Sequence, residues 1–473
     1  MYEGEVFSRQ MNRRENIRRR KRRRMWRRIL AGIMTVVLIS TSIVLTDRLL
    51  LVKVFAAPGQ GEGSVQPEVI NTLVEETVSG NLLFSEPEFI VEESGAPIII
   101  IDAGHGGADE GCAREGIREK DINLSIAKLV QGKLETLGYQ VLMIRDEDTY
   151  IAKEDRVIYA NQTQADIYVS IHQNASEDSS VSGMEVWYEG EDGSRDNKRL
   201  AQLIQQQLIQ NTGATERELR GDADFHVTGK TTMPACLIET GFLSNTEERS
   251  NLVTGEYQEK IAEGITQGIE LYFHPKTMYL TFDDGPSVEN TNRVLDILQE
   301  QDIKATFFLV GENVRKHPEI VQRIVTEGHT IGIHCDNHDY KTVYESVDSY
   351  IQDFEKAHQT VLDLTGIDVK IFRFPGGSIN DFNADVREEI IKEMTDRGYI
   401  YFDWNASLED AVKESDPEEL IANGVGTTLG RKKVVMLAHD VIYNTSICLE
   451  DLLDRLPEYE MLPLTDEVEP IQF

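Results

Sequence analysis

Short apolar segments alternate with amphipathic segments along most of this 473-residue chain. Apolar runs such as Ile98–Ile101 and Ala235–Ile238 indicate buried strands, whereas the longer segments between such runs have helical periodicity. Histidines and carboxylates follow several of the apolar runs, where a strand would end. This alternation predicts α/β domains, in which helices cover largely parallel sheets.

The first part of the pattern begins at Pro97 and ends near Phe273. It predicts a domain over residues 97–273 with a central, mostly parallel sheet, and Asp121 is a suitable N-cap for its first helix. The expected strands are Ile98–Ile101, Gln140–Ile144, Ile167–Ile171, Met184–Tyr188 and Ala235–Ile238, and the expected helices are Asp121–Leu137, Lys153–Asn161, Asp196–Gln210 and Tyr257–Tyr272.

A second series follows the short joint His274–Thr277 and extends over residues 278–460. Because the motif residues again stand just after strands, the pattern predicts a barrel-like closure with its site at the carboxyl ends of the strands. The expected strands are Met278–Phe282, Ala305–Val310, Thr330–Ile333, Val369–Arg373, Tyr399–Phe402 and Val434–Leu437, and the expected helices are Glu289–Gln301, Pro318–Glu327, Ser346–Leu364, Ala384–Arg397 and Pro417–Asn423.

The first half carries residues suited to a catalytic zinc ion. His105 and His172 each follow a predicted strand, and Glu119 supplies a carboxylate, so three protein ligands leave room for water. Glu239 also follows an apolar strand and suits a general base and proton shuttle. We expect Asn174 to support the ligands from outside the first coordination sphere.

Over residues 97–273 the chain resembles the zinc-dependent N-acetylmuramoyl-L-alanine amidases. The resemblance depends on Asp102-Ala-Gly-His105-Gly-Gly, Glu119-Lys-Asp-Ile-Asn-Leu124, Ser170-Ile-His172-Gln-Asn174 and Met233-Pro-Ala-Cys-Leu-Ile-Glu239, in this order. It implies that His105, Glu119 and His172 bind zinc and that Glu239 is the catalytic carboxylate. The implied reaction hydrolyses the amide between the lactyl group of muramic acid and the first alanine of the stem peptide.

The second half carries adjacent carboxylates, Asp283 and Asp284, which repel each other unless a cation or a proton intervenes. His334 and His338 are four residues apart, so both can face one ion together with Asp284. This predicts a divalent site, of zinc or another metal, with Asp283 free to act as a base. We expect His439 to be the general acid, oriented by Asp403, and Arg373 to hold Asp283.

These residues resemble the five motifs of the NodB-type polysaccharide deacetylases over residues 278–460. The motifs are Thr281-Phe-Asp283-Asp284-Gly-Pro286, His334-Cys-Asp-Asn-His338, Arg373-Phe-Pro375, Asp403-Trp404-Asn405 and Leu437-Ala-His439. The resemblance implies a distorted β/α barrel and removal of an N-acetyl group from an amino sugar, with Trp404 and Leu437 lining the acetyl pocket. Two positions depart from the family pattern: Cys335 replaces a Ser or Thr, and Gly376 replaces an aromatic residue that would form a wall of the substrate groove.

The N-terminal region has the pattern of a membrane anchor. Residues 1–28 contain eleven Arg and one Lys against three Glu, and Ile29 begins a nearly unbroken apolar run. The pattern predicts a basic cytoplasmic segment over 1–28, a transmembrane helix over 29–52 and a linker over 53–96, with both enzymatic halves outside the membrane. A cleaved signal ending near Val54-Phe-Ala56 is the alternative, and it also exports the body.

The charge and the cysteine content of the chain limit the classes of partner and bound metal that we expect. The net charge is −34 although the first segment is basic, so the remaining chain is strongly acidic and a nucleic-acid partner is not expected. The four cysteines contain no CxxC pair, so the sequence predicts neither a disulfide scaffold nor a thiolate zinc site.

Together these features predict a membrane-anchored, bifunctional enzyme that acts on peptidoglycan strands and stem peptides. If both reactions occur on one muramic acid, its free carboxylate and free amine can close into the lactam known from the endospore cortex, so a role in sporulation is one hypothesis. A second hypothesis separates wall turnover by the amidase from lysozyme resistance through N-acetylglucosamine deacetylation. A third is a wall-binding protein with an inactive site.

Overall fold

The computed structural model describes residues 95–190, 194–221, 225–411 and 416–473. The predicted basic segment 1–28 and anchor 29–52 lie outside these residues, as does the predicted linker except for its last two positions. Within the described part of the chain, none of the helices combines the length and the apolar character that crossing a bilayer requires.

The first half contains a five-stranded sheet in the order β4-β1-β5-β7-β6. All neighbours are parallel except β6 and β7, which are antiparallel, so the prediction of a mostly parallel sheet is confirmed. The strands are β1 (Ile98–Ala103), β4 (Gln140–Met143), β5 (Ile167–Asn174), β6 (Glu185–Tyr188) and β7 (Ala235–Phe242), and a small hairpin is formed by β2 (Ala113–Arg114) and β3 (Ile117–Arg118).

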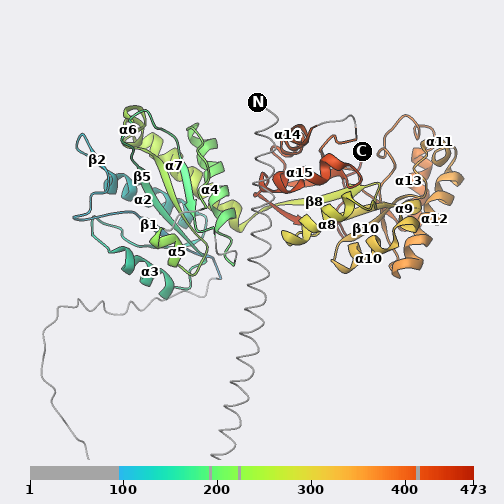
Figure 1. The fold of residues 1–473 in the computed structure, drawn as a ribbon, viewed down its shortest axis with the longest axis horizontal. Coiled ribbons are helices and arrows are strands. Elements are labelled where there is room, and N and C mark those ends of the chain that lie inside the picture. The colour runs from blue at the N-terminus through green and yellow to red at the C-terminus, as the bar shows by residue number, and fades with distance from the viewer. Residues whose placement is uncertain (1–94, 191–193, 222–224, 412–415) are drawn as a thin grey trace, which may run out of the picture. The chain divides into compact units, whose positions relative to one another are not determined.

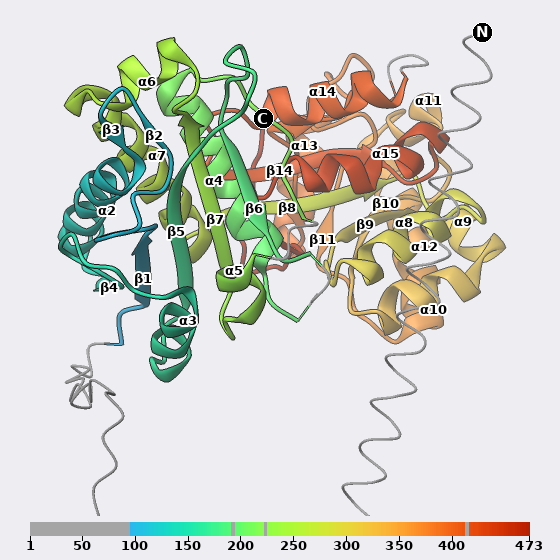
Figure 2. The same cartoon turned by 60° about the vertical axis from the view of Figure 1, so that its left-hand side comes forward.

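Helices cover both faces of this sheet, which explains why β1 is apolar throughout. Ile99 and Ile101 belong to one buried cluster, and Ile98 and Ile100 belong to another on the opposite face, because successive side chains alternate across a strand. The first cluster is covered by α2 (Glu119–Thr136), α4 (Asn197–Thr212) and α7 (Gly255–Phe273), and the second by α3 (Lys153–Gln162) and α5 (His226–Lys230) (Figures 1 and 2).

The second half contains an eight-stranded parallel sheet in the order β12-β11-β10-β9-β8-β14-β13, and β15 pairs with the beginning of β8. No ladder joins β12 to β13 in the described residues, so the predicted barrel is open. The strands are β8 (Lys276–Asp283), β9 (Thr306–Val310), β10 (Thr330–Cys335), β11 (Ile371–Phe372), β12 (Ile400–Tyr401), β13 (Ala406–Ser407), β14 (Lys433–His439) and β15 (Tyr459–Leu462).

Helices surround this sheet and enclose a core rich in phenylalanine. Phe282, Phe307, Phe308 and Phe372 are fully buried, and Phe282 stacks on Phe307 with ring centroids 5.2 Å apart. The helices are α8 (Asn290–Glu300), α9 (Gly311–Lys316), α10 (Pro318–Thr326), α11 (Tyr340–Val343), α12 (Val347–Thr365), α13 (Arg387–Asp396), α14 (Pro417–Thr428) and α15 (Tyr443–Asp454).

Several element boundaries differ from the sequence-based prediction. Helix α2 begins at Glu119, not at Asp121, because residue 118 has extended backbone and the Glu119 amide donates to the Cys112 carbonyl. The sequence analysis also missed α6 (Thr246–Leu252), α15 and β15. The earlier start of α2 is important for function, since it buries the Glu119 side chain beneath the β2–β3 hairpin region instead of leaving it on a loop.

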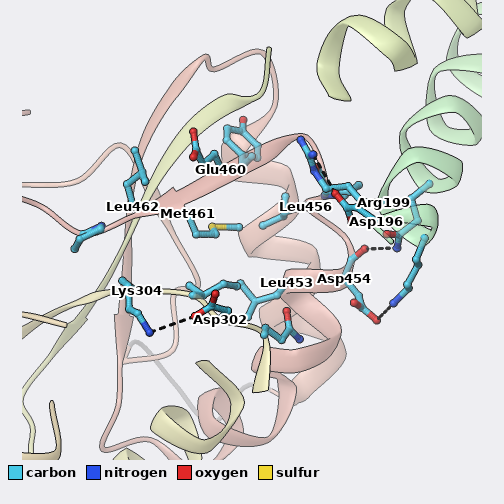
Figure 3. Close-up of a pocket in the computed structure, with 17 residues that line it drawn as sticks. Asp196, Arg199, Asp302, Lys304, Leu453, Asp454, Leu456, Glu460, Met461 and Leu462 are labelled. Atoms are coloured by element: carbon cyan, nitrogen blue, oxygen red, sulfur yellow. Dashed lines mark hydrogen bonds and ion pairs between the residues drawn. The ribbon is translucent and has the colours of Figure 1, made fainter. Parts of the chain in front are cut away.

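The described residues from 95 onwards belong to one compact unit, and polar contacts join α4 to the end of α15 and the segment after it. Lys198 Nζ lies 2.8 Å from Asp454 Oδ2, and Arg199 Nε donates to the Pro457 carbonyl at 3.1 Å. These residues border a pocket that Asp302, Lys304 and β15 also line (Figure 3). None of the predicted metal ligands lines this pocket.

Candidate metal centres and acid/base groups

The three predicted ligands of the first half come together at the carboxyl end of the sheet. His105 follows β1, His172 is on β5, and Glu119 is the first residue of α2. Glu119 Oε1 lies 3.2 Å from His105 Nε2 and 3.0 Å from His172 Nδ1, and one ligand atom from each residue lies within 4.8 Å of the others. Residue 104 must be glycine, because a Cβ there would lie 2.2 Å from the His172 ring.

The electrostatics of this cluster fit a divalent cation. Burial by itself raises the pKa of Glu119, but hydrogen bonds and positive charge from His105 and His172 outweigh it and hold the pKa well below its usual range. A buried carboxylate held ionised between two imidazoles matches the donor set of a catalytic zinc site. Asp109, which the sequence analysis missed, accepts from His105 Nδ1 at 2.8 Å and thereby directs Nε2 towards Glu119.

Glu239 lies beside this cluster without binding to it. It pairs with His172 in the β5–β7 register, and its Oε2 atom is buried with no hydrogen-bond partner among the described residues. Its pKa is raised well above the usual value because the carboxyl is shielded from water and faces the negative charges of Glu119 and Glu185. A carboxyl group that readily holds a proton next to a metal site is suited to general acid/base catalysis.

Asn174, predicted as a supporting residue, contacts a different carboxylate. Its Nδ2 donates to Glu185 Oε1 at 2.8 Å, and Arg217 Nε donates to Glu185 Oε2 at 2.7 Å. Glu185 is buried and stands opposite Glu239 on the antiparallel β6–β7 pair. Glu185 and Arg217 carry no signal in the sequence, because their relation to Glu239 depends on the pairing of β6 with β7.

A buried network below the cluster explains the first motif aspartate. Asp102 accepts from Tyr168 Oη at 2.6 Å and Ser170 Oγ at 2.9 Å, and it forms an ion pair with Arg156. Arg156 also donates to the His105 carbonyl at 2.7 Å. Asp102 therefore holds the strands and the ligand loop in place.

The second half forms its own cluster from Asp284, His334 and His338. Asp284 Oδ1 lies 3.4 Å from His334 Nε2 and 3.2 Å from His338 Nε2. This oxygen is buried and has no hydrogen-bond partner among the described residues, as expected for an atom that binds a cation. A carboxylate and two imidazoles accept zinc and several other divalent ions.

Among the described residues, three of the six non-glycine residues with positive φ angles are ligands of the two clusters. His105, Asp284 and His338 have positive φ angles of 61°, 74° and 53°. Such conformations cost about 1–3 kcal/mol each for residues other than glycine and persist where the surrounding structure imposes them. The positive φ of these residues supports a binding role for the two clusters.

Asp283, the predicted base, is buried at the end of β8 and is not part of the second ligand set. Its Oδ1 accepts from Arg373 Nη1 at 2.9 Å. Arg373 is fully buried and also donates to Thr281 Oγ1 and to the Phe402 carbonyl. These contacts fix the guanidinium, so Asp283 is held in one orientation beside the cluster.

The prediction that Asp403 orients His439 is wrong. His439 Nδ1 lies 2.8 Å from Asp410 Oδ1, and Asp410 Oδ2 accepts from the His439 amide and from Thr445 Oγ1. Asp403 instead accepts from the amide and hydroxyl of Ser378. The reason is topological: β13 pairs with β14 and brings the loop that follows β13, which carries Asp410, to the end of the strand that carries His439.

Asp410 also determines the protonation of His439. Burial lowers the pKa of His439, but the hydrogen bond and charge of Asp410, with the charges of Asp283 and Asp284, raise it to about 9. His439 is therefore protonated at neutral pH and can donate a proton to a leaving amine.

An Asp410→Asn substitution is expected to lower the pKa of His439, because the charge that stabilises the imidazolium is removed. Deacetylation that requires protonated His439 declines as pH rises through this pKa, which is about 9 in the parent chain. In a profile of kcat against pH, the decline at alkaline pH should then move to lower pH by about 1–3 units. The rate is measured by acetate release. Asp363→Asn on α12 is the matched control. An unchanged alkaline decline in Asp410→Asn would contradict the conclusion that Asp410 keeps His439 protonated.

The predicted acetyl-pocket residues belong to different parts of the second sheet. Leu437 is on β14, and Trp404 follows β12 and packs its ring against Phe473 with centroids 5.6 Å apart. A Cβ at residue 377 would lie 2.9 Å from the Trp404 ring, so Gly377 permits the close approach of its loop to this indole. The Arg373 guanidinium lies 5.7 Å from the centroid of the same ring.

Comparison with known proteins agrees with the two clusters. The family model of N-acetylmuramoyl-L-alanine amidases matches residues 99–271, and the polysaccharide deacetylase model matches residues 272–398. The germination-specific N-acetylmuramoyl-L-alanine amidase of Bacillus subtilis is 35% identical over 193 residues, which are 38% of this chain and 81% of that protein. The chain belongs to both families.

Relatives of the second half are named as peptidoglycan deacetylases. The peptidoglycan-N-acetylglucosamine deacetylase of Bacillus cereus is 30% identical over 187 residues, which cover 39% of this chain and 66% of that protein. The crystal structure of the catalytic domain of a peptidoglycan N-acetylglucosamine deacetylase from Eubacterium rectale is 31% identical, with a TM-score of 0.40, and covers 42% of this chain and 93% of that one. The two domains therefore indicate peptidoglycan-modifying activities.

Proposed function

We propose that the chain is a bifunctional enzyme that hydrolyses the muramoyl-L-alanine amide and removes the acetyl group from an amino sugar of the same polymer. The observation that carries this proposal is that each domain brings a complete set of three metal ligands next to a buried acid/base group outside the set. An inactive wall-binding protein would have no reason to keep two such constellations, with strained ligands in both.

In the amidase half, His105, Glu119 and His172 would hold a divalent cation, for which zinc suits the donor set. The bound cation would polarise the amide carbonyl and lower the pKa of water. Glu239 accepts the proton of the attacking water and delivers it to the alanine nitrogen as the C–N bond breaks. The products are the lactyl carboxylate of muramic acid and the free amino group of the peptide.

In the deacetylase half, Asp284, His334 and His338 would hold zinc or another divalent cation. Asp283, oriented by Arg373, takes the proton from the attacking water. His439, kept protonated by Asp410, donates its proton to the sugar nitrogen, so acetate and an amine leave. The base and the acid stand at the ends of the paired strands β8 and β14 and are held by different partners, Arg373 and Asp410.

We propose further that both reactions take place on one muramic acid. The amidase frees a carboxylate and the deacetylase frees an amine, and loss of water between them closes a lactam. The similarity to a germination-specific amidase supports this pathway. The second candidate is independent deacetylation of N-acetylglucosamine, which the similarity to the Bacillus cereus deacetylase favours.

Mass spectrometry of muropeptides separates the two candidates. Purified full-length protein, loaded with zinc, is incubated with peptidoglycan, and the Glu239→Ala and Asp283→Ala variants identify which half produces each change. The one-sugar pathway predicts deacetylated, peptide-free muramic acid or its lactam, and it predicts that Glu239→Ala suppresses both. Acetyl loss confined to N-acetylglucosamine in all samples would refute the pathway and support the second candidate.

We also propose that the chain is anchored in the cell membrane with both domains outside. The apolar run from Ile29 and the eleven arginines before it support this location, because basic residues flanking a membrane span stay in the cytoplasm. Both proposed substrates lie outside the membrane, which agrees with this orientation.

A further inference from the structure

An exposed aromatic side chain stands near the ligand set of the deacetylase half. Phe382 is 48% exposed, and Ile379 on the same loop is 55% exposed. The loop joins β11 to α13 and begins directly after the Arg373-Phe-Pro375 motif. A single exposed apolar residue is ordinary on a protein surface, so the contacts and rigidity of this loop must show whether Phe382 has a function.

A continuous series of rings connects Phe382 to a metal ligand. The ring centroids of His338 and Tyr340 are 5.1 Å apart, and those of Tyr340 and Phe382 are 5.2 Å apart. The Tyr340 hydroxyl has no hydrogen-bond partner within the described parts of the chain. The series thus extends from the reaction site to solvent and has a free polar group in its middle.

Tyr340 also packs against the residue at which this chain departs from its family. A Cβ at Gly376 would lie 3.2 Å from the Tyr340 hydroxyl, and the φ angle of Gly376 is 74°. The aromatic side chain usual at position 376 is missing, and Tyr340 stands against the backbone at that point. Two aromatic rings, those of residues 340 and 382, therefore lie beside the position at which the family usually has its aromatic residue.

The loop that carries Phe382 is firmly held. Asn380 Nδ2 donates to the carbonyls of Pro375 and Gly377, and Asn380 Oδ1 accepts from the Phe382 amide at 2.9 Å. Asn383 Nδ2 donates to the Ser378 carbonyl at 3.1 Å. An exposed apolar ring on a loop with this many internal hydrogen bonds is prepared for a ligand, since little conformational entropy is lost on binding.

We propose that Tyr340 and Phe382 form a binding surface for a pyranose ring of the glycan, next to the sugar that loses its acetyl group. This inference rests on the deacetylase function proposed above and adds how the enzyme selects a polymer. The apolar faces of pyranose rings stack on aromatic side chains, and the free Tyr340 hydroxyl can bond to a sugar hydroxyl. The Tyr340 ring separates Phe382 from the ligand His338, so the surface favours chains longer than one sugar.

The test compares substrates of different length with the full-length protein loaded with zinc. Acetate release is measured with the dimer and the hexamer of N-acetylglucosamine and with peptide-free glycan strands. Phe382→Ala should raise KM for the hexamer and the strands by about fivefold to tenfold, the effect of one aromatic contact, with kcat nearly unchanged. The dimer should be unaffected, and Phe382→Trp should restore the length dependence.

Leu429→Ala provides the matched control, because Leu429 is 76% exposed and precedes the start of β14, the strand whose far end carries His439. Calorimetry of hexamer binding is carried out in the Asp283→Asn background with and without Phe382→Ala, so that binding is measured independently of turnover. Equal hexamer affinity in both proteins, or an equal KM change for the dimer and the hexamer, would overturn the proposal. No acetate release by the parent chain would refute the deacetylase function itself, whereas the binding comparison would still show whether the surface binds sugar.

Discussion

The Glu239→Gln substitution is expected to lower the kcat of the amidase by a factor of about 10²–10⁴, the usual contribution of a general acid/base group. Glutamine keeps the size of the side chain but can neither accept the proton of the attacking water nor deliver it to the leaving nitrogen. The measurement is release of L-alanine-bearing peptides from purified peptidoglycan.

Two observations separate loss of catalysis from loss of structure in this variant. Glu239 is not among the three ligands, so zinc content should equal that of the parent chain. Its Oε2 has no hydrogen-bond partner among the described residues, so the substitution breaks no hydrogen bond at that atom. Acetate release by the other half of the same molecule is the internal control. An amidase rate within a few-fold of the parent would show that another group moves the proton.

The Asp283→Asn variant is expected to reduce deacetylation by a similar factor, about 10²–10⁴. The amide keeps an oxygen that can accept the hydrogen bond of Arg373, but it cannot take a proton from water. Arg373 keeps its bonds to Thr281 and Phe402, so the domain should remain folded with a lower free energy of unfolding. Acetate release from peptide-free glycan strands measures the effect.

The amidase activity of Asp283→Asn should be unchanged, because that site belongs to a different sheet. Thermal unfolding followed by circular dichroism and the metal content of the purified protein check that the deacetylase half is intact. Normal deacetylation with a full metal complement would contradict the role of Asp283 as the base. Asp440, a buried carboxyl whose pKa is raised to about 7, would then be the alternative candidate.

Local patterns were sufficient to predict the sheets and the ligand sets. The strand ends at His105, His172, Asp284 and His334 could be located because a fully buried parallel strand is apolar on both faces and its motif residues follow at once. The Arg373–Asp283 contact has the geometry that the sequence suggested. These features depend on short segments and on the rule that parallel strands align their carboxyl ends.

The partners of the acid/base groups could not be predicted in the same way. The motif that contains Asp403 predicts that this residue orients His439, but the pairing of β13 with β14 places Asp410 next to His439. Glu185 faces Glu239 because β6 pairs antiparallel to β7. The sequence pattern does not indicate Asp410 or Glu185, because the function of each depends on which strands become neighbours.

The sequence by itself determined that this protein has two α/β domains with two metal-binding residue sets, because apolar periodicity and strand-end motifs are local properties of the chain. Only the tertiary structure decided which carboxylates orient and charge the catalytic groups, that the barrel is open, and that Tyr340 packs against both Phe382 and Gly376. The physical reason is that pKa values and groove shape depend on side chains that are distant in sequence and a few ångströms apart in space.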